Sequence, residues 1–172
     1  LADMVSFGLL PSIMLYRLMV SINGESVWAY IPLVIAIFSA LRLAKFNVDD
    51  RQGENFLGLA TPACALWCGS LIYSADQGAM SIAGLLHDKY IILIASVVLA
   101  ILLVSEIPMF SMKFKKGSAG TPVFWQRIIF LGIVVVISVL VAIFRLNWSM
   151  IPLVTFIAYI LMNVAVYLIP SK

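Results

Sequence analysis

Charged residues are scarce in this chain. Asp, Glu, Lys and Arg make up 11% of its 172 residues, whereas they make up about 25% of a typical soluble domain. Apolar residues make up 63%, and the mean hydropathy is +1.11. No water-soluble portion remains once the apolar segments are counted. The sequence therefore indicates an integral membrane protein.

Histidine and cysteine are also rare, and their scarcity weighs against several kinds of site. His87 is the one histidine, and Cys64 and Cys68 share one apolar segment. Two packed thiols are therefore a better interpretation than a zinc site or a disulfide framework. The net charge of +3 is not gathered on a basic face of useful size, so we expect no nucleic-acid partner. Without internal repeats, an inverted-repeat transporter gains no support.

Long apolar stretches dominate the chain instead. Six of them approach the length of about 20 residues that a helix needs to cross a membrane. Nothing alternates as barrel strands do, so helices are the expected spanning form. We predict an all-α integral membrane fold in which residues 1–172 form a single transmembrane domain. The six predicted transmembrane helices lie near residues 4–22, 27–46, 57–75, 89–111, 124–144 and 149–169.

The positive charges are unevenly divided between the two ends of the predicted helices. If the end that carries Asp3 faces the cytoplasm, most basic residues lie on or near that side: Arg42, Lys45, Arg51, Lys113, Lys115, Lys116, Arg127 and Lys172. Lys89 and Arg145 lie near the opposite side, and Arg17 lies within the first helix. This is a positive-inside bias. It places Asp3 and the polar run at residues 42–55 on the cytoplasmic face.

Asp3 is the most informative single residue. A carboxylate at the start of a membrane helix is costly to place and usually has a function. On residue type alone, a helix N-cap explains it equally well. A divalent cation needs several oxygen ligands, and a carboxylate four residues earlier on the same helix face would precede residue 1. Because the chain has no initiator Met, we expect it to start inside a larger protein.

Ser39, Arg42 and Lys45 recur every three residues near the cytoplasmic end of the second predicted helix. They therefore share one face of that helix. Two cations on one stripe suit a diphosphate, because Arg offers a planar fork and Lys a point charge. Topology anchors whose charged heads reach the membrane interface explain the same stripe equally well.

Two further features have a structural interpretation that we prefer. The run GLATPACA at residues 58–65 consists mainly of small residues, which favour close helix packing over direct substrate contact. Such packing would bring Asp3 close to Arg42 and Lys45. Glu106 lies near a helix end, where we favour a structural ion pair with Arg127 or Lys113 over a catalytic role.

Several segments resemble the CDP-alcohol phosphatidyltransferase family, in the version that acts on serine. The run LADMVSFG at residues 1–8, followed by Pro11, resembles the end of the family signature D-x2-D-G-x2-A-R…G-x3-D-x3-D. Asp3 matches the final Asp, and every earlier element would precede residue 1. The run RLAKFN at residues 42–47 is similar to the family's R-L-A-R-F-N, with Lys45 in place of the second Arg.

The resemblance continues into the following segments. The run GLATPA at residues 58–63 is similar to G-L-P-T-P-A and departs from it at Ala60. The run VSEIP at residues 104–108, with Lys113 after it, resembles a V-S-x-I-P stretch. The matches occur in order over residues 1–113, whereas the last two predicted helices are generic.

This resemblance implies a membrane-embedded transferase that moves a phosphatidyl group from CDP-diacylglycerol to L-serine. It also implies a divalent cation, Mg²⁺ or Mn²⁺, close to Asp3, with the other ligands upstream of residue 1. Asp3 would be the general base for attack of the serine hydroxyl on the β-phosphorus. Arg42 and Lys45 are the candidate contacts for the diphosphate or the serine carboxylate. The further candidate substrate-binding residues are Ser6, Ser39, Asn47 and Thr61.

The family also implies a location, a partner and an oligomer. We expect a multi-pass protein of the bacterial inner membrane, with the bilayer as its partner, the active site facing the cytoplasm, and a homodimer. Truncated at the N-terminus, the chain is expected to be inactive or severely impaired by itself. Two alternatives stay open. One is the same chemistry on glycerol phosphate or inositol, and the other is a non-enzymatic membrane bundle or small transporter component.

Overall fold

The computed structural model describes residues 2–48, 55–76, 89–110 and 122–168. The first predicted stretch forms one continuous helix in three parts: α1 (Ala2–Met4), η1 (Val5–Leu9) and α2 (Leu10–Asn23). η1 is a widened, π-helical turn that lies just before Pro11. Proline has no N–H to donate and its ring crowds the carbonyl four residues earlier, which accounts for the widened turn.

The remaining helices follow the predicted order, with one small sheet between them. η2 (Val27–Leu33) is a 3-10 segment that leads into α3 (Val34–Val48). The later helices are α4 (Thr61–Asp76), α6 (Lys89–Val104), α7 (Pro122–Ile143) and α8 (Met150–Leu168). Strands β1 (Asn55–Leu57) and β2 (Pro108–Phe110) pair antiparallel, with Asn55 opposite Phe110 and Leu57 opposite Pro108.

Each of the six predicted stretches holds a helix, so the all-α membrane fold is confirmed in its coarse form. Four helical stretches of the described residues are long and apolar enough to cross a membrane: Ala2–Asn23, Val27–Val48, Val123–Ile143 and Met150–Leu168. α4 and α6 have 16 residues each. That is about 24 Å of helix, short of a hydrocarbon core of about 30 Å. Six membrane crossings therefore remain a prediction.

Two predicted helix boundaries differ from the observed ones for a shared reason. The stretch predicted at residues 57–75 begins as a helix at Thr61, and the stretch predicted at residues 89–111 ends as a helix at Val104. The residues just outside these helix ends form the β1–β2 pair, which the sequence analysis did not predict. Strands of three residues are too short to show a readable alternation, so their pairing becomes visible only in the tertiary structure.

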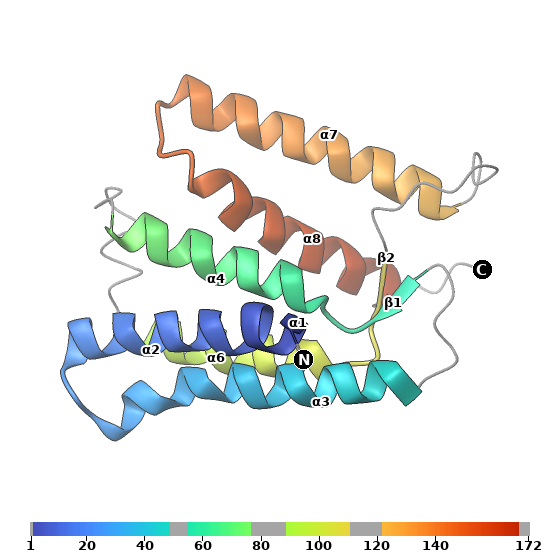
Figure 1. Cartoon of the computed structure of the whole chain (residues 1–172). Helices are drawn as coiled ribbons and strands as arrows, with labels where there is room; N and C mark the ends of the chain where they lie inside the picture. Colours follow the sequence, from blue (N-terminus) through green and yellow to red (C-terminus); the bar gives the residue numbers. More distant parts are fainter. Residues whose placement is uncertain (1, 49–54, 77–88, 111–121, 169–172) are drawn as a thin grey trace.

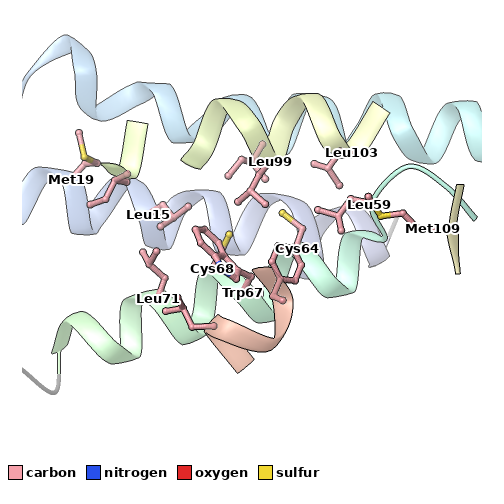
Figure 2. Packing of buried hydrophobic residues seen from close by; sticks show 14 of the residues in the cluster. Leu15, Met19, Leu59, Cys64, Trp67, Cys68, Leu71, Leu99, Leu103 and Met109 are labelled. Carbon is pink, nitrogen blue, oxygen red and sulfur yellow. The ribbon is translucent and has the colours of Figure 1, made fainter. Parts of the chain in front are cut away.

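The helices lie side by side around α4 (Figure 1). α4 separates the group formed by α2, α3 and α6 from α8, and α7 packs on the outer side of α8. The apolar core runs along α4, where Cys64, Cys68 and Leu71 meet Leu15 of α2 and Leu99 of α6 (Figure 2). Both thiols are free and buried, so the interpretation of Cys64 and Cys68 as packed apolar side chains is confirmed.

Successive helices run in alternating directions, so they sort the chain between two ends (Figure 1). One end, which we call the strand end, gathers the start of α1, the end of α3, the start of α4 and both strands. Asp3 and the run at residues 42–47 therefore lie toward the same end, as the alternation of the predicted helices requires. At the opposite end, Ser74 Oγ of α4 donates a hydrogen bond to Ser149 Oγ at 2.6 Å.

Candidate functional site

Gly8 allows the first helix to lie directly against α3. A Cβ atom placed on Gly8 would be 2.7 Å from Ser39 Cβ and 3.1 Å from Ser39 Oγ. Ser39 is fully buried, and its Oγ has no hydrogen-bond partner among the described residues. The candidate substrate contact Ser39 thus lies beneath Gly8, in the interface between the two helices.

Arg42 is a buried cation next to this interface. Its side chain is 7% exposed, and its Nε has no hydrogen-bond partner among the described residues. It lines a small cavity together with Leu57 of β1 and Leu103 of α6. A buried charge is unfavourable unless an opposite charge and good hydrogen bonds compensate it. The role of Arg42 as a contact for an anionic group therefore stays a prediction.

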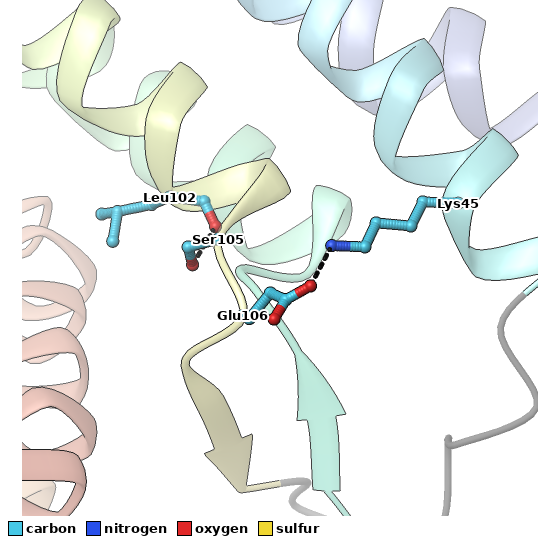
Figure 3. Close-up of polar contacts among 4 residues, drawn as sticks. All are labelled: Lys45, Leu102, Ser105 and Glu106. Atoms are coloured by element: carbon cyan, nitrogen blue, oxygen red, sulfur yellow. Dashed lines mark hydrogen bonds and ion pairs between the residues drawn. The ribbon is translucent and has the colours of Figure 1, made fainter.

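Lys45 lies one helical turn beyond Arg42, and its Nζ is 3.1 Å from Oε1 of Glu106 (Figure 3). The side chains are 40% and 64% exposed, so the pair contributes little to stability. Its main effect is to tie the end of α3 to the connection between α6 and β2. The sequence favoured Arg127 or Lys113 as the partner of Glu106. The structure shows Lys45 as one partner of Glu106. The pair with Arg127 stays a prediction, and Lys113 lies outside the described residues.

Gly58 and Leu59 form a tight junction at the C-terminal end of α6. The Gly58 N–H donates to the Ile107 carbonyl at 3.0 Å, and the Leu59 N–H donates to the Leu102 carbonyl at 2.9 Å. Gly58 has a φ of 72°, and a Cβ there would lie 2.7 Å from the Ser105 carbonyl oxygen. The close packing predicted for residues 58–65 is confirmed at this junction. Thr61, which follows it, is 2% exposed.

Asp3, Ser6 and Asn47 are all exposed. The segment α1–η1 packs against α3 and α4. Asp3 lies five residues before Gly8, or about 7.5 Å along a helix. Gly8 lies against Ser39, and α3 runs antiparallel to the first helix. The same distance measured along α3 from Ser39 toward its C-terminal end therefore leads to Arg42 and Lys45. The fold therefore brings Asp3 and the two cations to one end of the molecule.

Two residues of α8 that the sequence analysis passed over shape this end. Phe110 of β2 donates its N–H to Asn163 Oδ1 at 3.0 Å, and its carbonyl accepts from the Tyr159 hydroxyl at 3.0 Å. Asn163 Nδ2 donates to the Tyr159 carbonyl at 2.7 Å. The last two predicted helices were thought generic, yet α8 anchors β2. The available signal was a pair of polar residues four apart on an apolar helix.

The described residues do not by themselves fit a divalent metal. No group of three or more His, Cys, Asp or Glu side chains gathers within the described ranges. At the strand end, Asp3 is exposed and Glu106 is paired with Lys45. One carboxylate is too few for Mg²⁺, which requires near-octahedral oxygen coordination. No catalytic step is therefore assigned to a metal on these residues.

The described residues form the apolar helical bundle of a membrane protein, with a buried arginine toward the strand end. Known proteins make that class more specific. No protein-family profile matches the chain. It is 30% identical over 138 residues to CDP-diacylglycerol–serine O-phosphatidyltransferase of Helicobacter pylori strain 26695, covering 79% of this chain and 56% of that protein. The enzyme of strain J99 is 31% identical over the same shares.

An archaeal protein shows the same similarity over a shorter length. Archaetidylserine synthase of Methanothermobacter thermautotrophicus is 30% identical over 97 residues, which cover 56% of this chain and 41% of that protein. The chain thus spans about half the length of the curated relatives it matches. The resemblance to serine-transferring CDP-alcohol phosphatidyltransferases, first drawn from short motifs, is confirmed by these relatives.

Proposed function

We propose that this chain contributes the membrane bundle of an enzyme of phospholipid biosynthesis. It transfers a phosphatidyl group from CDP-diacylglycerol to L-serine and releases CMP. The observation that carries the proposal is Arg42, a nearly buried cation whose Nε has no hydrogen-bond partner among the described residues. It lies next to Lys45 and toward the same end of the bundle as Asp3. An anionic group bound at Arg42 would compensate a charge for which the described residues show no ion pair.

The chemistry assigns separate tasks to these side chains. The Arg42 guanidinium binds phosphate oxygens through its planar fork, and Lys45 adds a point charge near the surface. Asp3 accepts the proton of the serine hydroxyl as its oxygen forms a bond to the β-phosphorus. The bond from that phosphorus to the oxygen bridging the two phosphates breaks, and CMP leaves with the electron pair. Phosphatidylserine remains in the bilayer.

A divalent cation, Mg²⁺ or Mn²⁺, belongs to the proposal as a neutraliser of diphosphate charge. Asp3 is the residue of this chain that would lie close to it. The proposal also includes a single transmembrane domain with six crossings, and the bacterial inner membrane as its location. The strand end faces the cytoplasm, and the protein is a homodimer. The positive-inside bias of the sequence supports the orientation.

The test is serine-dependent CMP release in detergent with Mn²⁺ or Mg²⁺. It should be run on this chain and on the longest open reading frame that contains it, with glycerol phosphate and inositol as competing acceptors. We expect serine to be the preferred acceptor. Asp3→Asn should abolish turnover while membrane insertion persists, because the amide cannot take the proton. Preference for another alcohol would redirect the proposal to the other acceptors. Absence of CMP release from either protein would favour a non-enzymatic bundle.

A further inference from the structure

A small cavity lies beside Arg42, between the ends of α3 and α6. Its walls include Arg42, Lys45 and Phe46 of α3, Leu57 of β1, and residues 103–105 at the end of α6. Its volume is about 10 Å³, which is room for about one water molecule. The apolar groove along α8 is larger, at about 360 Å³, but shares no lining residue with this cavity. A phosphate group is several times larger than a water molecule, so the cavity at Arg42 is closed to the anion that the proposed function requires.

The ion pair between Lys45 and Glu106 joins the two walls of this cavity. Lys45 lines the cavity on α3, and Glu106 directly follows the lining residue Ser105. The two charged atoms, Lys45 Nζ and Glu106 Oε1, are 3.1 Å apart (Figure 3). The ammonium group one helical turn from Arg42 is therefore already bound to a carboxylate of the protein itself.

Backbone hydrogen bonds fix the wall that carries Glu106. The Leu59 N–H donates to the Leu102 carbonyl at 2.9 Å. On the other side of Glu106, the Gly58 N–H donates to the Ile107 carbonyl at 3.0 Å. The charged side chains of the ion pair are 40% and 64% exposed, so water can solvate both when they separate. These side chains, rather than the backbone around Glu106, are therefore the parts that move when the cavity opens.

Arg42 and Lys45 differ in how their charges are compensated. Arg42 is 7% exposed, and within the described part of the chain it has neither an ion pair nor a hydrogen-bond partner for its Nε. Lys45 has an exposed partner, and an exposed ion pair is worth little. A diphosphate would compensate the buried charge of Arg42 and offer Lys45 a new partner at the same time. Such an anion can therefore displace the carboxylate from Lys45.

We propose that Glu106 is a positioning residue that holds Lys45 while the site is empty and yields it to the diphosphate of the nucleotide lipid. This rests on the proposed function, because it places that diphosphate at Arg42. Glu106 is thus an internal competitor of the substrate, and its pairing with Lys45 lowers the affinity for the nucleotide lipid. The pair re-forms as CMP leaves and so favours release of the product.

The experiment measures equilibrium binding of CDP-diacylglycerol to the full chain in nonionic detergent micelles, separately from CMP release. Glu106→Gln removes the charge and keeps the size of the side chain. We expect it to tighten binding about two- to fivefold, as the loss of one exposed ion pair allows. In a Lys45→Met background, Glu106→Gln should bring no further gain, because no ammonium is left to compete for. Glu25→Gln is the matched control, since it removes the same charge at an exposed residue near the opposite end, and it should leave the affinity unchanged.

Unchanged or weaker binding in Glu106→Gln would overturn the inference, and so would failure of CDP-diacylglycerol to bind the unsubstituted chain. An equal gain in Glu25→Gln, or an equal gain with and without Lys45, would also overturn it, because long-range repulsion would explain either result. Serine-dependent CMP release with no gain in Glu106→Gln would leave the proposed function standing and remove this role of Glu106. A gain that depends on Lys45, without CMP release, would support this role and remove the proposed activity.

Discussion

Gly8 of the first helix packs directly against Ser39 of α3, since a Cβ on Gly8 would lie 2.7 Å from Ser39 Cβ. Real Cβ atoms do not approach so closely, and both positions lie on helix backbones that cannot yield independently. The absence of a side chain at residue 8 therefore sets the distance between Asp3 and the cations of α3.

Gly8→Ala should push the first helix away from α3. We expect lower thermal stability in detergent, by about 1–3 kcal/mol for an overpacked interface, and a larger loss of CMP release as Asp3 moves. Gly69→Ala is the matched control. Gly69 lies in α4 with nothing near the added Cβ, so alanine should be neutral or slightly stabilising there. Equal melting temperatures for the two variants would contradict this role of Gly8.

Gly58→Ala should destabilise the junction between α6 and the strands for two reasons. The left-handed backbone at φ 72° costs a non-glycine residue about 1–2 kcal/mol, and the new Cβ would strike the Ser105 carbonyl oxygen. Gly24→Ala is a control for positive φ without a clash, because Gly24 has a φ of 67° and a ψ of −174° and nothing lies within 4 Å of a Cβ there. Thermal unfolding should show a clearly larger loss for Gly58→Ala. If the two variants lost the same stability, the clash with the Ser105 carbonyl oxygen would contribute nothing.

Arg42→Lys should weaken binding of the nucleotide lipid although the charge is kept. A single ammonium cannot reproduce the planar fork, and hydrogen bonds to charged groups contribute about 1.5–3 kcal/mol. The KM for CDP-diacylglycerol should rise by about one to two orders of magnitude. Arg145→Lys, at an exposed residue near the opposite end, should leave the KM unchanged. An unaltered KM in Arg42→Lys would return Arg42 to the role of a topology anchor.

Substitutions of Lys45 and Glu106 should show that the charge of Lys45 affects substrate binding, whereas their ion pair contributes little to the free energy of unfolding. Both side chains are substantially exposed, so Glu106→Gln should change the free energy of unfolding by less than about 1 kcal/mol. Lys45→Ala should raise the KM for the nucleotide lipid or for serine, because a charge next to Arg42 is lost. Unfolding in detergent and initial rates of CMP release measure the two effects. If Glu106→Gln unfolds the protein, the pair has a structural role that its exposure does not suggest.

The sequence predicted which residues lie at the strand end, but it did not predict the contacts between them. Asp3 and the residues of the run 42–47 were placed on one face by helix alternation and by charge. The burial of Arg42 was not predictable, because Leu57 and Leu103, which line the same small cavity, come from elements farther along the chain. The partner of Lys45 was missed for the same reason, since Glu106 is 61 residues away. Asn163 and Tyr159 were passed over, although they are polar residues four apart on a mostly apolar helix.

The sequence by itself determined that this is a helical membrane protein, where its helices lie, and how their ends alternate. Those properties follow from hydropathy, helix-breaking residues and charge, all of which act locally along the chain. Only the tertiary structure decided that Arg42 is buried with no partner for its Nε among the described residues, that the Leu59 N–H caps the C-terminal end of α6, and that a groove opens along α8. These features arise where faces of distant helices pack together, and local periodicity does not specify which faces meet.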